Sequence, residues 1–111
     1  MLTKPVGTGV LSTAAKAELL TDGQMKEMIG LMSTLNKGAQ EVMLPLHPSA
    51  CTDITGFGLL GHLNEMLAGR CGAQLHWKAL PHIPQALEYA DEFLLTAAAQ
   101  RNRNHLEGRW S

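Results

Sequence analysis

The chain has 111 residues, of which 45% are hydrophobic and 17% charged, and its formal net charge is −1. This length suits one domain rather than two, and the composition is that of an ordinary globular protein. The near-neutral charge gives no electrostatic reason to expect a nucleic acid or an anionic membrane as a partner. No apolar run approaches the length of a membrane span, and no signal pattern opens the chain.

The chain contains two cysteines, Cys51 and Cys71. Two are too few for a disulfide framework, and their spacing fits no metal site. We therefore expect a reducing, cytoplasmic setting. Both thiols are predicted to be buried or half-buried.

The N-terminal residues predict a short strand followed by a helix. Residues 2–6 read as a strand end, and residues 7–9 (Gly-Thr-Gly) as a flexible turn. A plain turn is the favoured interpretation, although its backbone N–H groups would also suit an anion. Ser12 or Thr13 is the expected N-cap of a helix that reaches Leu20.

A second helix is predicted behind Thr21, because Gln24 follows at the spacing of a capping box. Residues 36–38 resemble a helix stop, yet apolar residues keep the period as far as Leu44, so both endpoints stay open. The apolar face is rich in methionine and is interpreted as core filling, with a soft-metal face as the minor alternative. Its members are Met25, Met28, Ile29, Met32 and Leu35.

The centre of the chain predicts a buried strand, a glycine turn and a helix. Residues 50–54 are short or β-favouring, residues 56–61 are punctuated by glycine, and helical spacing then runs from Leu59 to Leu67. Asp53 stands at the end of the predicted strand. Open α/β sheets bind their ligands at such strand ends.

Residues 56–61 also match the letters G-x-G-x-x-G, so a dinucleotide site is a rival interpretation. It lacks the acidic residue expected about 20 positions later, where the chain reads His76–Leu80. Asp53 would also repel a pyrophosphate unless a cation lay between them. A Mg²⁺–phosphate site at Asp53 removes that conflict. The alternative is that Asp53 is only a helix N-cap, and the residues alone leave both interpretations open.

The last third of the chain predicts one more strand and more helix. Residues 73–80 alternate as a half-buried strand with His76 toward solvent. A helix follows with Pro84 in its first turn and continues through Leu94 to Ala97. Residues 96–100 would also pass as helix, and residues 101–105 form a basic cluster interpreted as solvated surface. Together the elements predict an α/β (α+β type) fold, a mixed β-sheet with packed helices.

Two segments carry a family resemblance. Residues 2–10 (LTKPVGTGV) and 50–63 (ACTDITGFGLLGHL) resemble signature segments of the selenophosphate synthetase (selenide, water dikinase) family. The resemblance implies the C-terminal domain fold of the aminoimidazole ribonucleotide synthetase superfamily, with residues 1–111 as one partial domain, truncated at its C-terminal end. The N-terminal ATP-binding domain is then expected to be absent. Residues 96–100 depart from the glycine- and proline-rich turn of well-known members.

The resemblance also implies a function: selenophosphate made from selenide, ATP and water by a homodimer, with release of AMP and phosphate. Asp53 matches the family's C-terminal ligand for Mg²⁺ at the ATP phosphates. No catalytic residue carries over, because neither Cys51 nor Cys71 matches the family's nucleophile, and the chain alone is expected to be inactive. Another ATP-using member of the superfamily, or a non-catalytic dimerisation or binding module, remains an alternative.

Overall fold

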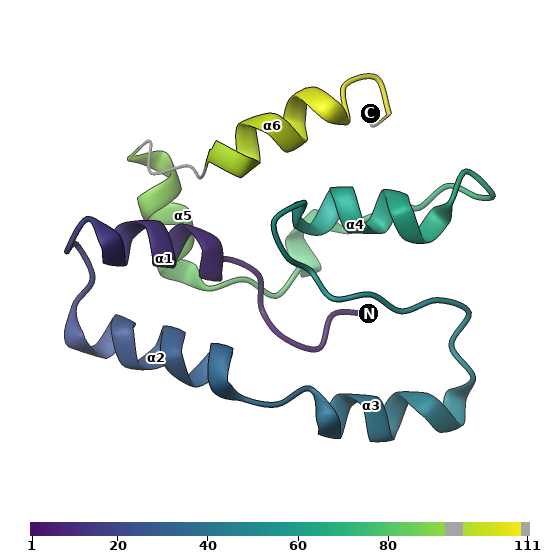
Figure 1. Cartoon of the computed structure of the whole chain (residues 1–111), viewed down its shortest axis with the longest axis horizontal. Coiled ribbons are helices and arrows are strands. Elements are labelled where there is room, and N and C mark those ends of the chain that lie inside the picture. Colours follow the sequence, from purple (N-terminus) through teal and green to yellow (C-terminus); the bar gives the residue numbers. More distant parts are fainter. Residues whose placement is uncertain (93–96, 110–111) are drawn as a thin grey trace.

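The computed structural model describes residues 1–92 and 97–109. These residues form a flat helical arrangement of 42 × 36 × 22 Å (Figure 1). Its radius of gyration is 15.1 Å, against about 13 Å for a compact domain of this size. The elements in chain order are α1 (Thr8–Lys16), α2 (Asp22–Ser33), α3 (Lys37–Met43), the 3₁₀ helix η1 (Leu44–Leu46), α4 (Gly58–Leu67), the 3₁₀ helix η2 (Trp77–Ala79), α5 (Pro84–Asp91) and α6 (Ala97–His105).

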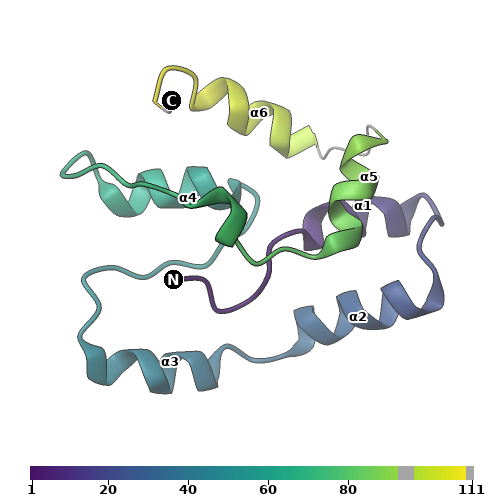
Figure 2. The same cartoon turned by 180° about the vertical axis from the view of Figure 1, so that it is seen from behind.

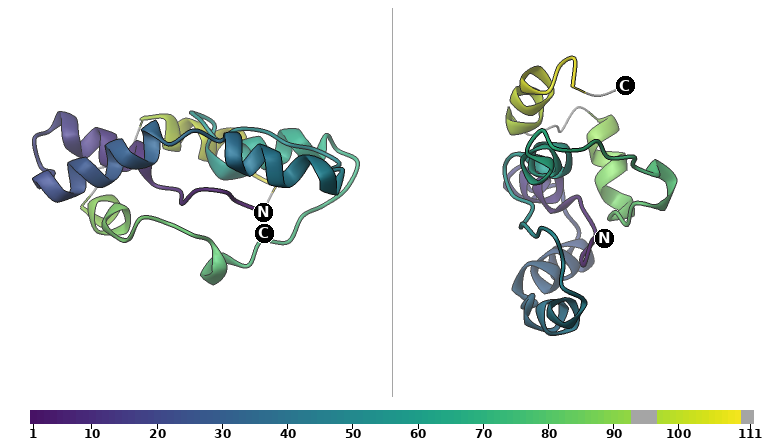
Figure 3. Two further views of the ribbon diagram at one scale, coloured as in Figure 1. Left: turned by 90° about the horizontal axis from the view of Figure 1, so that it is seen from below. Right: turned by 90° about the vertical axis from the view of Figure 1, so that its right-hand side faces the viewer.

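The core lies where α1 packs against both α2 and α5 (Figures 1 and 2). Leu11 of α1 is completely buried, and it meets Met28 of α2 together with Ile83 and Ala86 at the start of α5. Seen from below, α1 and α2 overlap, and α5 lies to one side of them (Figure 3). Of the helices in the described part of the chain, none has both the length and the apolar composition that a membrane crossing requires.

A parallel bridge between Val6 and His82 brings the start of the chain to α5. The Val6 N–H donates to the Pro81 carbonyl at 3.0 Å, and the Ile83 N–H donates to the Val6 carbonyl at 3.0 Å. This bridge fixes the entry of α1 against the beginning of α5, although 75 residues separate the paired positions.

Gly7 allows the tight contact that follows the bridge. Its φ of +125° is a conformation that side chains rarely adopt. A Cβ atom at this position would lie 2.7 Å from the Cβ of Ala86. Gly7 therefore provides both the turn into α1 and the room for α5.

Helix α1 begins and ends earlier in the chain than the sequence predicts. Gly7 is its N-cap, whereas the predicted caps Ser12 and Thr13 lie inside the helix. The Thr13 hydroxyl donates to the Gly9 carbonyl at 3.1 Å, as hydroxyls inside helices commonly do. The helix stops at Lys16 rather than Leu20.

The capping box of α2 is confirmed. The Gln24 N–H donates to the Thr21 hydroxyl at 3.2 Å, and the Thr21 N–H donates to Gln24 Oε1 at 3.0 Å. The methionine face fills the core only in part. Met28 is buried, but Met32 is 63% exposed and Leu35 is 79% exposed, so the core-filling interpretation is wrong at the far end of this face.

The sequence leaves two ends open for this helix, a stop at residues 36–38 or a continuation to Leu44, and the structure contradicts the continuation because α2 ends at Ser33. Thr34 takes an extended conformation, its hydroxyl donates to the Gly30 carbonyl at 2.7 Å, and the Lys4 ammonium donates to its carbonyl. These contacts satisfy the Gly30 carbonyl in the last turn of α2 and the carbonyl of its C-cap residue, and the helix ends at Ser33. The apolar period continues instead in α3, a separate helix without buried residues.

The predicted mixed sheet is not confirmed in the described residues. Residues 50–54 are irregular and exposed, and of residues 2–6 only Val6 pairs. In the third segment, residues 73–76 are irregular, and residues 77–79 turn into η2 with Trp77 73% exposed. β-Favouring composition is not enough for a strand, because its N–H and C=O groups need a neighbouring strand.

The C-terminal helices agree with the sequence at their starts. Pro84 occupies the first turn of α5, as predicted. This helix ends at Asp91, and the predicted positions Leu94 and Thr96 lie outside the described residues. The segment after them is helical, since α6 includes residues 97–105.

Candidate functional site

The predicted glycine turn leads directly into α4, as expected. The Gly58 N–H donates to the Thr55 carbonyl at 2.9 Å, which closes a turn over residues 55–58. Gly58 has a φ of +68° and is the first residue of α4, one position before the predicted start at Leu59. The helix then presents its first turn beside α6 (Figure 1).

His62 holds this turn from the side of α4. It is 8% exposed and is the one buried polar or charged residue in the described part of the chain. Its Nε2 lies 3.1 Å from the Thr55 hydroxyl, and its Nδ1 lies 3.1 Å from a carboxylate oxygen of Glu65. The ring of Phe57 packs against the imidazole with 5.4 Å between ring centroids.

Asn102 of α6 holds the same turn from the other side. Its side-chain N–H donates to the Gly56 carbonyl at 2.8 Å. Gly61 leaves room for Phe57, because a Cβ there would lie 2.9 Å from the Phe57 Cβ. The glycines of this motif therefore allow a tight turn and close side-chain packing.

Asp53 lies two residues before this turn, in an exposed segment without regular structure. Within residues 1–92 and 97–109, its carboxylate has no hydrogen bond or ion pair to another side chain. The N-cap of α4 is Phe57, which has no side-chain cap bond, so the interpretation of Asp53 as a cap is wrong. The carboxylate is thus accessible to a ligand.

The structure does not bring other metal ligands to Asp53. The described residues contain no group of three or more His, Cys, Asp or Glu side chains placed to hold a metal ion. The metal role of Asp53 therefore stays a prediction. A dinucleotide site of the predicted kind follows a β-strand, and residues 50–54 do not form one. This finding counts against the dinucleotide interpretation.

The remaining candidate side chains lie at the surface. Cys51 and Cys71 are both free and exposed, so the prediction of buried or half-buried thiols is wrong. They lie in exposed segments without regular secondary structure. His76 is exposed, as predicted.

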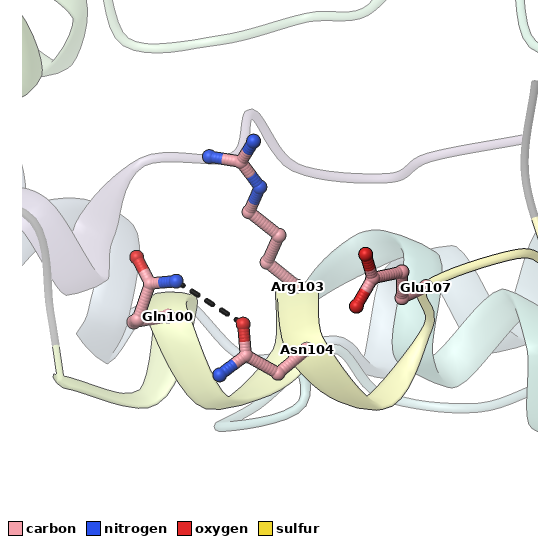
Figure 4. Close-up of a pocket in the computed structure, with 4 residues that line it drawn as sticks. All are labelled: Gln100, Arg103, Asn104 and Glu107. Carbon is pink, nitrogen blue, oxygen red and sulfur yellow. Dashed lines mark hydrogen bonds between the residues drawn. The ribbon is translucent and has the colours of Figure 1, made fainter.

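Helix α6 carries a shallow polar hollow (Figure 4). Its lining residues are exposed and come from this helix and the turn that follows it: Gln100, Arg103, Asn104 and Glu107. The Gln100 amide donates to Asn104 Oδ1 at 3.2 Å, and Arg103 extends away from the helix (Figure 4). This face is the solvated surface that the sequence predicts.

The contacts of His62 and Asn102 are not predicted by the sequence. The cluster at residues 101–105 was interpreted as solvated, yet Asn102 is partly buried and reaches Gly56 across 46 positions. No local periodicity reports such a contact. His62 had a weak signal, because it lies one turn after Gly58 on the helix that the glycines open.

Comparison with known proteins matches residues 1–102 to the family described as AIR synthase related protein, C-terminal domain. The selenide, water dikinase of Desulfitobacterium hafniense is 47% identical over 110 residues, or 97% of this chain and 32% of the relative. That of Clostridium botulinum is 41% identical over 112 residues, or 100% of this chain and 32% of the relative. The Campylobacter jejuni protein of the same name is 44% identical over 102 residues, or 92% and 30%.

The chain thus spans about a third of the length of these curated relatives. The family match covers nearly all of its residues, including the turn at residues 55–58 and helices α1 to α5. The chain belongs to the AIR synthase related protein family, through the C-terminal domain of that family.

Proposed function

We propose that this chain is part of a selenide, water dikinase. The enzyme would transfer a phosphoryl group from ATP to selenide and would release AMP and phosphate, with water as the second acceptor. Relatives of that name, 41–47% identical along nearly the whole chain, support the proposal. The observation that carries it is the exposed Asp53 carboxylate beside a turn that His62 and Asn102 hold.

The chemistry of Asp53 fits one ligand of a Mg²⁺ ion. Mg²⁺ prefers oxygen ligands and is commonly bound by one or two carboxylates together with substrate phosphates. When bound, the ion would offset negative charge on the transferring phosphoryl group. Asp53 supplies a single carboxylate in an open segment, so other ligands would come from outside the described residues.

Three further points belong to this proposal. The chain by itself would be inactive, because one carboxylate does not position ATP and its metal ions. The whole enzyme would be a homodimer in the cytoplasm. The cytoplasm suits the two free, exposed cysteines, because it keeps thiols reduced.

Residues 50–54 and 73–76 would complete a mixed sheet by pairing with strands outside this chain, since their exposed backbone is open to such pairing.

The test uses the full-length enzyme with ATP, Mg²⁺ and selenide, followed by phosphorus NMR. Wild-type enzyme should produce selenophosphate and AMP. Asp53→Asn should keep the fold but lose most product, because the neutral amide is a weaker Mg²⁺ ligand. Asp91→Asn is the matched control, since Asp91 is an exposed carboxylate at the end of α5.

The outcomes separate the two parts of the proposal. Selenophosphate from both wild type and Asp53→Asn would keep the activity and reject the metal role. A folded wild type that consumes ATP without making selenophosphate would reject the activity and favour another ATP-using member of the superfamily. ATP turnover by residues 1–111 alone, above a buffer control, would refute the expected inactivity of the isolated chain.

A further inference from the structure

We propose that Thr55 and His62 are positioning residues that set the direction of the Asp53 carboxylate. This inference rests on the proposed metal role of Asp53. It assigns a purpose to the one buried polar or charged side chain that the described residues contain. His62 does not reach Asp53 itself; it acts through the turn at residues 55–58.

The backbone around Asp53 is held by contacts that lie after it in the chain. Residues 50–54 are exposed and irregular, so packing does not hold them. The first anchored position downstream is Thr55, whose hydroxyl meets His62 Nε2 at 3.1 Å and whose carbonyl accepts from the Gly58 N–H at 2.9 Å. Gly56 is the next anchored position, because its carbonyl accepts a hydrogen bond from the Asn102 side chain. The path of the chain at Asp53 is therefore set from its downstream side.

The contacts of His62 determine which group donates in its hydrogen bond with Thr55. An ionised carboxylate only accepts hydrogen bonds, so Glu65 assigns the proton of a neutral imidazole to Nδ1. Nε2 is then an acceptor, and the Thr55 hydroxyl donates to it. The imidazole end of this bond is buried, since His62 is 8% exposed and its ring packs against Phe57. The bond therefore favours one side-chain direction for Thr55, which lies two residues after Asp53.

The arrangement resembles the outer contacts that orient ligands in metal sites, where loss of one partner typically lowers metal affinity by about 10- to 100-fold. Thr55→Val removes the hydroxyl while keeping the shape of the side chain. Thr55 is exposed, so this change creates no cavity. Thr55→Ser keeps the hydroxyl and is the conservative partner of this variant.

The experiment measures Mn²⁺ binding to the full-length enzyme in the presence of a non-hydrolysable ATP analogue, by the electron paramagnetic resonance signal of free Mn²⁺. Mn²⁺ accepts the same carboxylate and phosphate oxygens as Mg²⁺. We expect Thr55→Val and His62→Phe to weaken binding by about tenfold, and Thr55→Ser by less than about twofold. Thr34→Val should bind like wild type; it is the matched control, an exposed threonine whose hydroxyl bonds a carbonyl in α2.

A double-mutant cycle tests whether the effect passes through Asp53. If it does, Thr55→Val should have no further effect on Mn²⁺ affinity in the Asp53→Asn protein, because neighbouring groups that act together are not additive. A weakening by Thr55→Val that is equally large in the Asp53→Asn background would overturn the proposal. So would wild-type affinity in Thr55→Val, or an Asp53→Asn protein that binds Mn²⁺ as tightly as wild type.

Failure of this inference is distinguishable from failure of the proposed function. Selenophosphate synthesis that depends on Asp53, together with unchanged Mn²⁺ affinity in Thr55→Val, would leave the function and remove the positioning role. Mn²⁺ affinity that depends on Thr55 and Asp53, in an enzyme that makes no selenophosphate, would support the positioning role and reject the proposed function. Should His62→Phe fail to fold, the exposed Thr55 variants decide the question alone.

Discussion

Replacing Gly7 with alanine should destabilise the protein more than its size suggests. The new Cβ would lie 2.7 Å from the Cβ of Ala86, far inside normal contact distance. Overpacking of this kind costs about 1–3 kcal/mol. The φ of +125° adds a backbone strain of about 1–3 kcal/mol for a residue with a side chain. The sum, about 2–6 kcal/mol, is a large part of the 5–15 kcal/mol that typically stabilises a domain.

Urea unfolding followed by far-ultraviolet circular dichroism measures this cost, provided that the slope of the transition is unchanged. Gly30→Ala is the matched control. Gly30 lies inside α2, where a Cβ would meet nothing within 4 Å, so alanine should stabilise the protein by about 0.5–1 kcal/mol.

A second substitution separates the two contributions at Gly7. Ala86→Gly removes the atom that the new Cβ would strike, so Gly7→Ala with Ala86→Gly should show a smaller cost for the Gly7 change. The backbone strain should remain. A Gly7→Ala protein as stable as wild type would refute the reasoning about both the contact and the φ angle.

Three further predictions follow from the packing and the surface. Leu11→Ala should lower the free energy of unfolding by about 2–5 kcal/mol, measured in urea, because it empties the centre of the core. Thr21→Ala should cost about 1 kcal/mol in the same assay, because it removes the side-chain cap of α2. Cys51 and Cys71 should both react with a thiol reagent in the native protein as fast as in urea, since both are exposed; mass spectrometry counts the adducts.

Each of these predictions has a result that would contradict it. A stable Leu11→Ala protein would mean that the core lies elsewhere. A Thr21→Ala protein with wild-type stability, beside an unaffected Thr52→Ala control in an irregular segment, would show that the capping box contributes nothing. Thiols that react only after urea is added would show that both cysteines are buried, as the sequence predicts.

The sequence predicted elements whose cause is local. The capping box at Thr21 and the proline at the start of α5 depend on residues within one turn, and both were found where expected. The start of α4 was placed within one residue because Gly58 determines the local backbone. Such features are readable because a few adjacent residues supply all of their interactions.

The errors have a non-local cause. Residues 50–54 have β-favouring composition, but a strand exists only with a neighbour, and the chain supplies none there. At the end of α2, the carbonyl of Thr34 accepts a hydrogen bond from Lys4, 30 positions away. At the candidate site, the motif predicts Asp53 as a ligand, whereas the hydrogen bond from Asn102 to Gly56 spans 46 positions and has no periodic signal in the sequence.

The separate packing of the helices has a consequence for how the chain opens. Helices α1, α2 and α5 share one core, α4 pairs with α6, and α3 packs within the described residues only against η1. Cooperative units defined in this way open at different free energies. Amide hydrogens of α3 should exchange with solvent first, those of α4 and α6 later, and those around Leu11 last. The turn beside Asp53 belongs to the middle group, so a ligand that bridges it to other parts of an enzyme would slow its exchange selectively.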